Sequence, residues 1–132
     1  MPSIEWNKRH WTASLALHSD DGSRDFEYGD QWGTVESYPP LEVVRDAWLL
    51  PFVGPQQNIL EIGTGGGRWT QFLINAKKLY SVDVNPVMLE YAAKRFGAVD
   101  NLSLIHTDGV LARYPSRDRT FSPLRATLTS RS

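Results

Sequence analysis

Apolar residues in the central part of the chain change their spacing in a regular order. Short, nearly continuous apolar runs at 58–62, 79–84 and 102–109 are typical of buried β-strands. Between these runs, apolar residues recur three and four positions apart over 67–76 and 86–97, a spacing that predicts helices with one buried face. Strands and helices that alternate with short links predict an α/β fold: a parallel sheet with right-handed crossovers.

The same pattern predicts two more helices on the N-terminal side. Residues 8–18 carry apolar side chains at helical spacing, and a second helix begins after Pro39 and is closed by Pro51. The apolar positions of this second helix are Leu41, Val44, Ala47 and Trp48. In the central part, Asn85 is a good N-cap for the helix that ends at Gly97.

Composition and charge exclude several classes of protein. The 132 residues are 41% hydrophobic and carry a net charge of −1, which gives no general attraction to nucleic acid or to an anionic membrane. The chain has no cysteine, and its three histidines are scattered, so we expect no metal site. The N-terminus lacks a signal-peptide pattern, and the longest apolar run is too short to span a membrane. A cytoplasmic location is therefore expected.

The stretch "ILEIGTGGGRWTQFL" places a glycine-rich turn between a strand and a helix. Such a turn lets the backbone approach a ligand, with N–H groups at the start of the helix aimed at an anionic part of it. The dinucleotide fingerprint G-x-G-x-x-G fits poorly, because Arg68 stands where the third glycine belongs. The phosphate-binding pattern that ends in Lys-Ser/Thr is absent, because no lysine follows the turn.

The pattern that does fit is E-x-G-x-G-x-G, formed by Glu61, Gly63, Gly65 and Gly67. It resembles the first motif of the class I S-adenosylmethionine-dependent methyltransferases. Two further acids follow in the order that the family has: Asp83 ends the second strand, and Asp108 follows the third. The resemblance covers roughly residues 40–113 and implies a Rossmann-like sheet flanked by helices, with S-adenosylmethionine as cofactor.

The resemblance also implies which residues contact the cofactor. Asp83 would accept hydrogen bonds from the ribose hydroxyls, Val84 would contact the adenine, and Asp108 would lie near the adenine amino group. Glu61 and the glycine turn would serve the methionine end of the cofactor. The expected cofactor-binding residues are Glu61, Gly63, Thr64, Gly65, Gly67, Asp83, Val84, Asp108 and Gly109. No catalytic residue is assigned, because the sulfonium is already an activated methyl donor and a general base is optional.

Three segments are expected in the chain. Residues 1–39 form a helical and loop segment that is a candidate lid, and 40–113 form the cofactor-binding half-domain. Residues 114–132 are rich in Ser and Thr and hold four Arg against one Asp, and Pro123 interrupts the strand expected there. We expect this tail to be disordered.

The tail also suggests that the sheet is incomplete, because members of the family that the chain resembles continue into further strands. The expected order 3-2-1-4-5 would be cut beside the first strand, which suggests an N-terminal portion with a premature or out-of-frame end. About three strands are then expected, with a bare sheet edge through which a homodimer could pair.

Three functions follow as alternatives. The first is methyl transfer to an unidentified acceptor, expected to be a small molecule. The second is a non-catalytic module that binds adenosylmethionine or a protein partner. The third, an NAD(P)-binding half-domain, is disfavoured by Arg68. No feature indicates nucleic acid as a partner.

Overall fold

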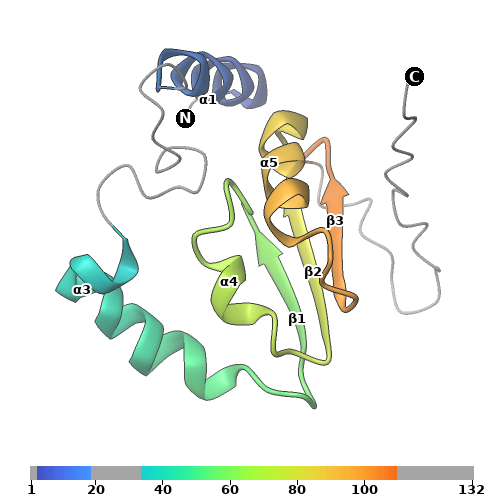
Figure 1. The fold of residues 1–132 in the computed structure, drawn as a ribbon. Helices are drawn as coiled ribbons and strands as arrows, with labels where there is room; N and C mark the ends of the chain where they lie inside the picture. The colour runs from blue at the N-terminus through green and yellow to red at the C-terminus, as the bar shows by residue number, and fades with distance from the viewer. Residues whose placement is uncertain (1–2, 19–33, 110–132) are drawn as a thin grey trace.

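The structure is a computed structural model that describes residues 3–18 and 34–109 (Figure 1). Expectations for 19–33 and 110–132, including the tail and any fourth strand, lie outside the described residues. The elements are α1 (Ile4–His18), the 3₁₀ turn η2 (Val35–Ser37), α3 (Pro39–Val43), the π-helical η3 (Val44–Leu49), the 3₁₀ turn η4 (Leu50–Phe52), β1 (Asn58–Ile62), α4 (Thr70–Leu73), β2 (Lys78–Asp83), α5 (Pro86–Phe96) and β3 (Leu102–His106). No described helix is long and apolar enough to cross a membrane.

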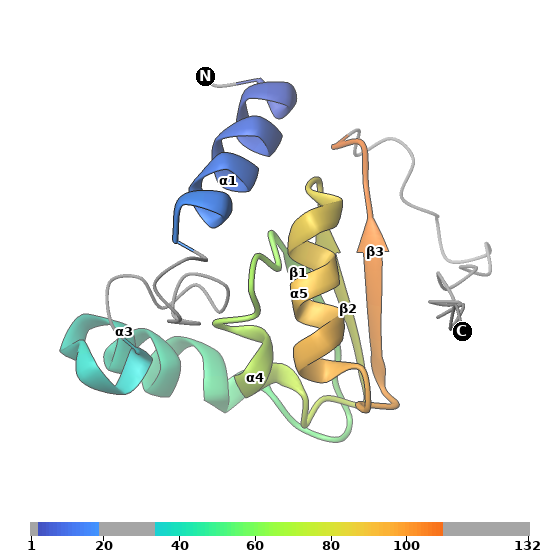
Figure 2. The ribbon, with the colours of Figure 1, turned by 45° about the horizontal axis from the view of Figure 1, so that its top comes forward.

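Among the described residues, three parallel strands form one sheet in the order β1-β2-β3. In this register Glu61 of β1 pairs with Ser81 of β2, which pairs with Leu104 of β3. Helices α4 and α5 cover one face of the sheet, and α1 lies beyond the carboxyl ends of the strands (Figures 1 and 2). The predicted partial Rossmann-like fold and its parallel sheet are confirmed. Parallel strands present all their carboxyl ends at one edge, and the site lies there.

The core forms where α5 packs on the sheet. Asn85 caps the helix by accepting a hydrogen bond from the Val87 N–H at 3.0 Å, as the sequence predicts. The buried face of α5 consists of Met88, Leu89, Ala92 and Phe96, and it packs on the side of the sheet where Leu79 of β2 is buried. The apolar spacing over 86–97 predicts a buried face of Leu89, Ala92, Ala93 and Phe96. The structure confirms this face except that Met88 is also buried and Ala93 is only half-buried.

Three helices differ from their predictions. The helix expected over 8–18 begins earlier, at Ile4. The helix expected over 67–76 is reduced to the four residues of α4, with turns at 68–69 and after Leu73. Gly67 has φ +89, a left-handed conformation that excludes it from a right-handed helix. The helix after Pro39 forms as α3, a π-helical turn and a 3₁₀ turn. Of its predicted apolar positions, Leu41 is half-buried, whereas Val44, Ala47 and Trp48 are exposed, Trp48 by 74%. Its Arg45 instead lies over the ring of Phe72, at 5.7 Å.

Candidate functional site

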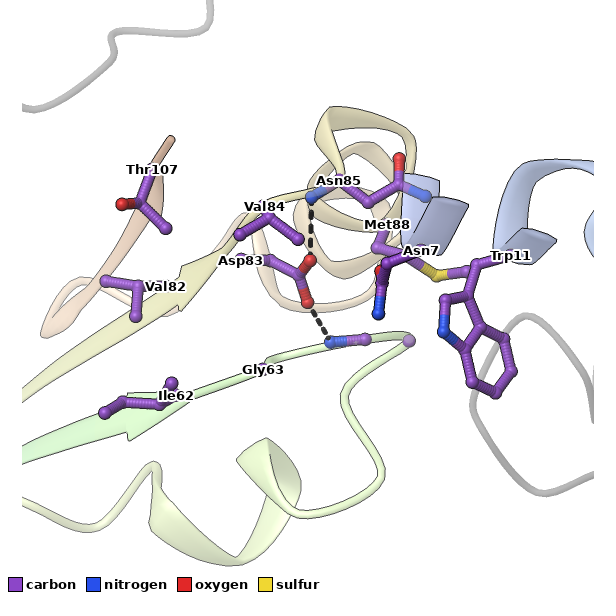
Figure 3. A pocket seen from close by; sticks show the side chains of 12 residues that line it. Asn7, Trp11, Ile62, Gly63, Val82, Asp83, Val84, Asn85, Met88 and Thr107 are labelled. Carbon is purple, nitrogen blue, oxygen red and sulfur yellow. Dashed lines mark hydrogen bonds between the residues drawn. The ribbon is translucent and has the colours of Figure 1, made fainter. Parts of the chain in front are cut away.

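A cavity of about 420 Å³ lies at the carboxyl ends of the strands (Figure 3). Its volume is in the range of small-molecule sites, roughly 300–1,000 Å³. Three parts of the chain supply most of its lining. The glycine loop supplies Gly63, Gly65 and Gly66; the end of β2 supplies Val82, Asp83 and Val84; and α1 supplies Asn7 and Trp11 from across the cavity. The structure therefore brings four predicted residues together: Gly63, Gly65, Asp83 and Val84.

The glycine loop presents bare backbone to this cavity. Gly65 has φ +53, and a Cβ added there would meet no atom within 4 Å, so the space above it is open. The loop is held from behind by α5, where Arg95 donates to the Gly66 carbonyl at 3.2 Å. A Cβ added at Gly67, by contrast, would collide with the ring of Phe96. Gly65 thus leaves room for a ligand, while Gly67 allows the loop to pack against α5.

Asp83 joins the loop to the next helix. Its Oδ2 accepts a hydrogen bond from the Gly65 N–H at 2.9 Å, and its Oδ1 accepts one from the Asn85 N–H at 2.8 Å (Figure 3). Each carboxylate oxygen has a second lone pair for a ligand hydroxyl, since an ionised carboxylate offers about four acceptor positions. Asp83 therefore fixes the shape of the loop and still presents an acid to the cavity.

Glu61 lies on the helix-covered side of β1 and is not among the residues that line the cavity. Its carboxylate accepts hydrogen bonds from Thr70 Oγ1 at 2.8 and 3.1 Å and from Ser81 Oγ at 2.6 Å. Burial raises the pKa of the Glu61 carboxyl above its ordinary value; the bonds from Ser81 and Thr70 oppose the rise, and Asp83 adds to it. In this structure Glu61 ties β1 to β2 and α4.

The other predicted residues lie around the cavity without lining it. Thr64 is 4% exposed, and its Oγ1 has no hydrogen-bond partner among the described residues. Gly67 contacts Phe96, as described above. Asp108 is exposed in the turn after β3, and Gly109 follows it with φ +79, close to Ile4 of α1.

Sequence reasoning missed the contribution of α1. Asn7 and Trp11 lie four positions apart on one face of this helix, and both point to the cavity (Figure 3). Asn85 Nδ2 donates to the Lys8 carbonyl at 3.4 Å and to Thr12 Oγ1 at 3.3 Å, and these bonds hold α1 in place. The helical spacing of residues 8–18 predicted the helix, but nothing in the sequence indicates where it docks.

Met88 and Thr107 complete the cavity wall with Ile62 and Asn85. Each was predicted only as part of a helix, a strand or a cap. In the part of the chain that the structure describes, no three His, Cys, Asp or Glu side chains are grouped so that they could hold a metal ion.

A parallel sheet with a glycine loop after β1 and an acid at the end of β2 defines a Rossmann-like, cofactor-binding α/β domain. The chain belongs to the family described as "Methyltransferase domain", whose model matches residues 59–127, more than half of the chain. This confirms the family that the sequence motifs indicated.

Curated relatives extend the comparison. The chain is 33% and 34% identical over 79 residues to proteins named "Probable ribosomal RNA small subunit methyltransferase A" from Methanosarcina mazei and Methanosarcina acetivorans. The match covers 59% of this chain and 29% of each relative. The chain therefore spans under a third of the length of these relatives.

Solved structures support the fold. A Haemonchus contortus phosphoethanolamine N-methyltransferase, in complex with phosphoethanolamine and S-adenosylhomocysteine, matches with a TM-score of 0.52 and 20% identity over 81% of this chain and 22% of its own. The DhpI–SAH complex matches with a TM-score of 0.52 and 24% identity over 80% of this chain and 45% of its own. The expectation of an adenosylmethionine-type cofactor is confirmed at the level of the family.

Proposed function

We propose that this chain binds S-adenosylmethionine in the cavity between the glycine loop, the end of β2 and α1. The observation that carries the proposal is the open backbone at Gly65 opposite the carboxylate of Asp83, which line the same cavity. These groups fit the two polar ends of the cofactor. The bare backbone at Gly65 lets the methionine end of the cofactor approach the loop closely, and an acid suits the ribose hydroxyls.

The apolar part of the cavity wall fits the adenine. Val82, Val84 and Met88 offer aliphatic and thioether surface beside Asp83, and such surfaces suit a flat, weakly polar ring. When bound, the cofactor supplies a methyl group on a sulfonium, already activated for transfer. The chain's own residues then have to orient the cofactor and exclude water.

The direct contacts predicted for Glu61, Thr64, Gly67, Asp108 and Gly109 stay predictions. None of the five lines the cavity. For Glu61 and Gly67, the contacts described above support a role in holding the strand and the loop. The partnerless Oγ1 of Thr64 favours a polar partner near the loop.

For the acceptor, we propose a small molecule, since the net charge of −1 offers no general attraction to a polyanion. The fold neighbour that acts on phosphoethanolamine is an example on the same architecture. A second candidate is RNA. It is favoured by the names of the Methanosarcina relatives and by the exposed, stacked rings of Trp6 and His10, 4.6 Å apart on α1, because unpaired bases stack on such rings.

Titration calorimetry tests the cofactor proposal. The chain is titrated with S-adenosylmethionine, with S-adenosylhomocysteine and with NADH. We expect binding of the first two and none of NADH; binding of NADH alone would reject the proposal. Methyl transfer from labelled cofactor to small amines, to alcohols and to an RNA fragment then separates the acceptors. Cofactor binding with no transfer to any acceptor would favour the non-catalytic module.

Two further expectations remain proposals. The cytoplasmic location remains an expectation drawn from the sequence. Pairing of two copies through the edge of β1 is supported by the strand order, because β1 pairs only with β2 among the described strands.

A further inference from the structure

Asn85 is buried where three elements meet. The residue is 1% exposed. Its backbone N–H donates to Asp83 Oδ1 at 2.8 Å, and its Oδ1 caps α5 by accepting from the Val87 N–H at 3.0 Å. Its Nδ2 donates to the Lys8 carbonyl at 3.4 Å and to Thr12 Oγ1 at 3.3 Å, both in α1. One side chain therefore serves both the cap of α5 and the docking of α1.

The bonds to α1 lie next to the part of α1 that lines the cavity. Lys8 follows Asn7 in the chain and Thr12 follows Trp11, and Asn7 and Trp11 line the cavity. Because a helix moves as a rigid unit, a shift of α1 at Lys8 and Thr12 would displace Asn7 and Trp11 by a similar amount.

The glycine loop, which forms the opposite wall of the cavity, is hydrogen-bonded to the same segment, 83–85. The Gly65 N–H donates to Asp83, and Asp83 accepts from the Asn85 N–H. A continuous set of hydrogen bonds thus runs from the glycine loop through 83–85 to α1. It fixes the separation of the two walls before any ligand enters, and such preorganisation increases affinity.

We propose that Asn85 is a positioning residue that sets α1 against the cavity and so sets the affinity for the adenosyl ligand. The inference rests on the proposed function, because it takes that cavity as the ligand site. It differs from a role in capping α5, which requires only an acceptor at this position.

The test separates the two roles with small substitutions. Asn85→Ser keeps a good N-cap but loses the amide that reaches α1, and Asn85→Ala loses both. Thr12→Val removes one acceptor from an exposed position of α1. The matched control is Asn101→Ser. The Asn101 amide also donates two hydrogen bonds, to the Ile74 and Ala76 carbonyls, but it does not line the cavity.

Two measurements are made on each full-length variant: the Kd for S-adenosylhomocysteine by calorimetry, and amide exchange of peptides from α1 and α5 by mass spectrometry. We expect Asn85→Ser and Asn85→Ala to weaken binding equally, by about 5-fold or more, the scale of one or two neutral hydrogen bonds. Exchange should rise in α1 for both variants, and Asn85→Ala should lower the melting temperature more than Asn85→Ser, because it also loses the cap. Thr12→Val should weaken binding by less, and Asn101→Ser should bind as wild type.

Wild-type Kd and wild-type α1 exchange in Asn85→Ser would overturn the inference, as would faster α1 exchange with an unchanged Kd. An equal loss of affinity in Asn101→Ser would also overturn it, because the effect would then be general. A wild-type chain that binds no S-adenosylhomocysteine would instead reject the proposed function itself.

Discussion

Two carboxyl groups near the cavity have different hydrogen-bond partners. Asp83 accepts two backbone N–H groups and lines the cavity. Glu61 accepts two hydroxyl groups on the helix-covered side. Backbone N–H donors at 2.8–2.9 Å hold the side chain of Asp83 in place at the end of β2. Burial of Glu61 opposes ionisation. The two acids therefore lead to different predictions.

Replacement of Asp83 by Ala should lower both the stability of the protein and its affinity for the ligand. The change leaves the Gly65 and Asn85 N–H groups without their acceptor, and an unsatisfied partly buried donor costs about 1–3 kcal/mol. We expect the affinity for S-adenosylhomocysteine to fall by about 5-fold or more for the same reason. Calorimetry and urea unfolding measure the two effects. Asp100→Ala, the same loss of charge at an exposed turn, should change neither; an unaltered affinity in Asp83→Ala would place the ribose elsewhere.

Replacement of Glu61 by Gln should change how stability depends on pH. The folded pKa of Glu61 is raised, so its contribution to stability is present below the unfolded pKa, about 4.3, and is lost as the pH rises through the folded pKa. Wild type should therefore lose stability relative to Glu61→Gln across that window. Urea unfolding of both proteins from pH 4 to pH 8 measures the difference. Glu90→Gln, at an exposed position on α5, is the control, and a pH-independent difference would contradict the expectation.

At the scale of elements, the glycine loop lies between the cavity and helix α5. Its Gly65 end faces the open cavity, and its Gly67 end rests on Phe96 of α5. Between these two glycines, the Gly66 carbonyl accepts a hydrogen bond from Arg95, the residue before Phe96. Helix α5 therefore fixes the rear of the loop while Asp83 fixes the front, and the two glycines have separable roles.

The substitutions Gly65→Ala and Gly67→Ala should separate stability from binding. Both place alanine in a left-handed conformation, at a cost of about 1–2 kcal/mol. Gly67→Ala also overpacks against Phe96, which adds ~1–3 kcal/mol. Gly65→Ala should lose more ligand affinity, because its methyl group enters the open space of the cavity. Urea unfolding and calorimetry compare them.

A double variant tests whether the collision with Phe96 causes the loss of stability in Gly67→Ala. Phe96→Leu removes the ring edge that Gly67→Ala would strike, so the double variant should recover part of the lost stability relative to the sum of the single changes. Strict additivity would mean that the collision with Phe96 is not the cause. Equal losses of affinity in the two glycine variants would contradict the division of roles within the loop.

The sequence predicted a helix or strand well where its apolar residues kept one regular spacing. It predicted less well where a glycine loop or a contact with a distant element decided the structure. β1 and α5 have clear apolar patterns, and Asn85 has a clear cap signal, so their bounds agree with the structure within a residue. The exclusion of Gly67 from α4 follows from its left-handed conformation, which the apolar spacing of 67–76 does not reveal. The place of α1 depends on bonds between residues more than 70 positions apart, which no local pattern reports.

At the scale of the whole molecule, the sheet is covered unevenly. Because successive strand residues alternate between faces, and Glu61 faces α4, Leu60 and Ile62 lie on the opposite face of β1. They are 52% and 70% exposed. β1 also pairs only with β2 among the described strands. An apolar strand at the edge of a sheet readily pairs with another chain.

We therefore expect the isolated chain to self-associate through β1. Leu60→Lys should suppress this association, because a charged side chain on an edge strand opposes pairing with a second strand. The control is Val43→Lys, which adds the same charge at an exposed apolar position of α3. Sedimentation velocity over a range of protein concentrations should show a concentration-dependent dimer for wild type and Val43→Lys, and a monomer for Leu60→Lys. A wild-type chain that stays monomeric, or equal dissociation of both variants, would contradict pairing at this edge.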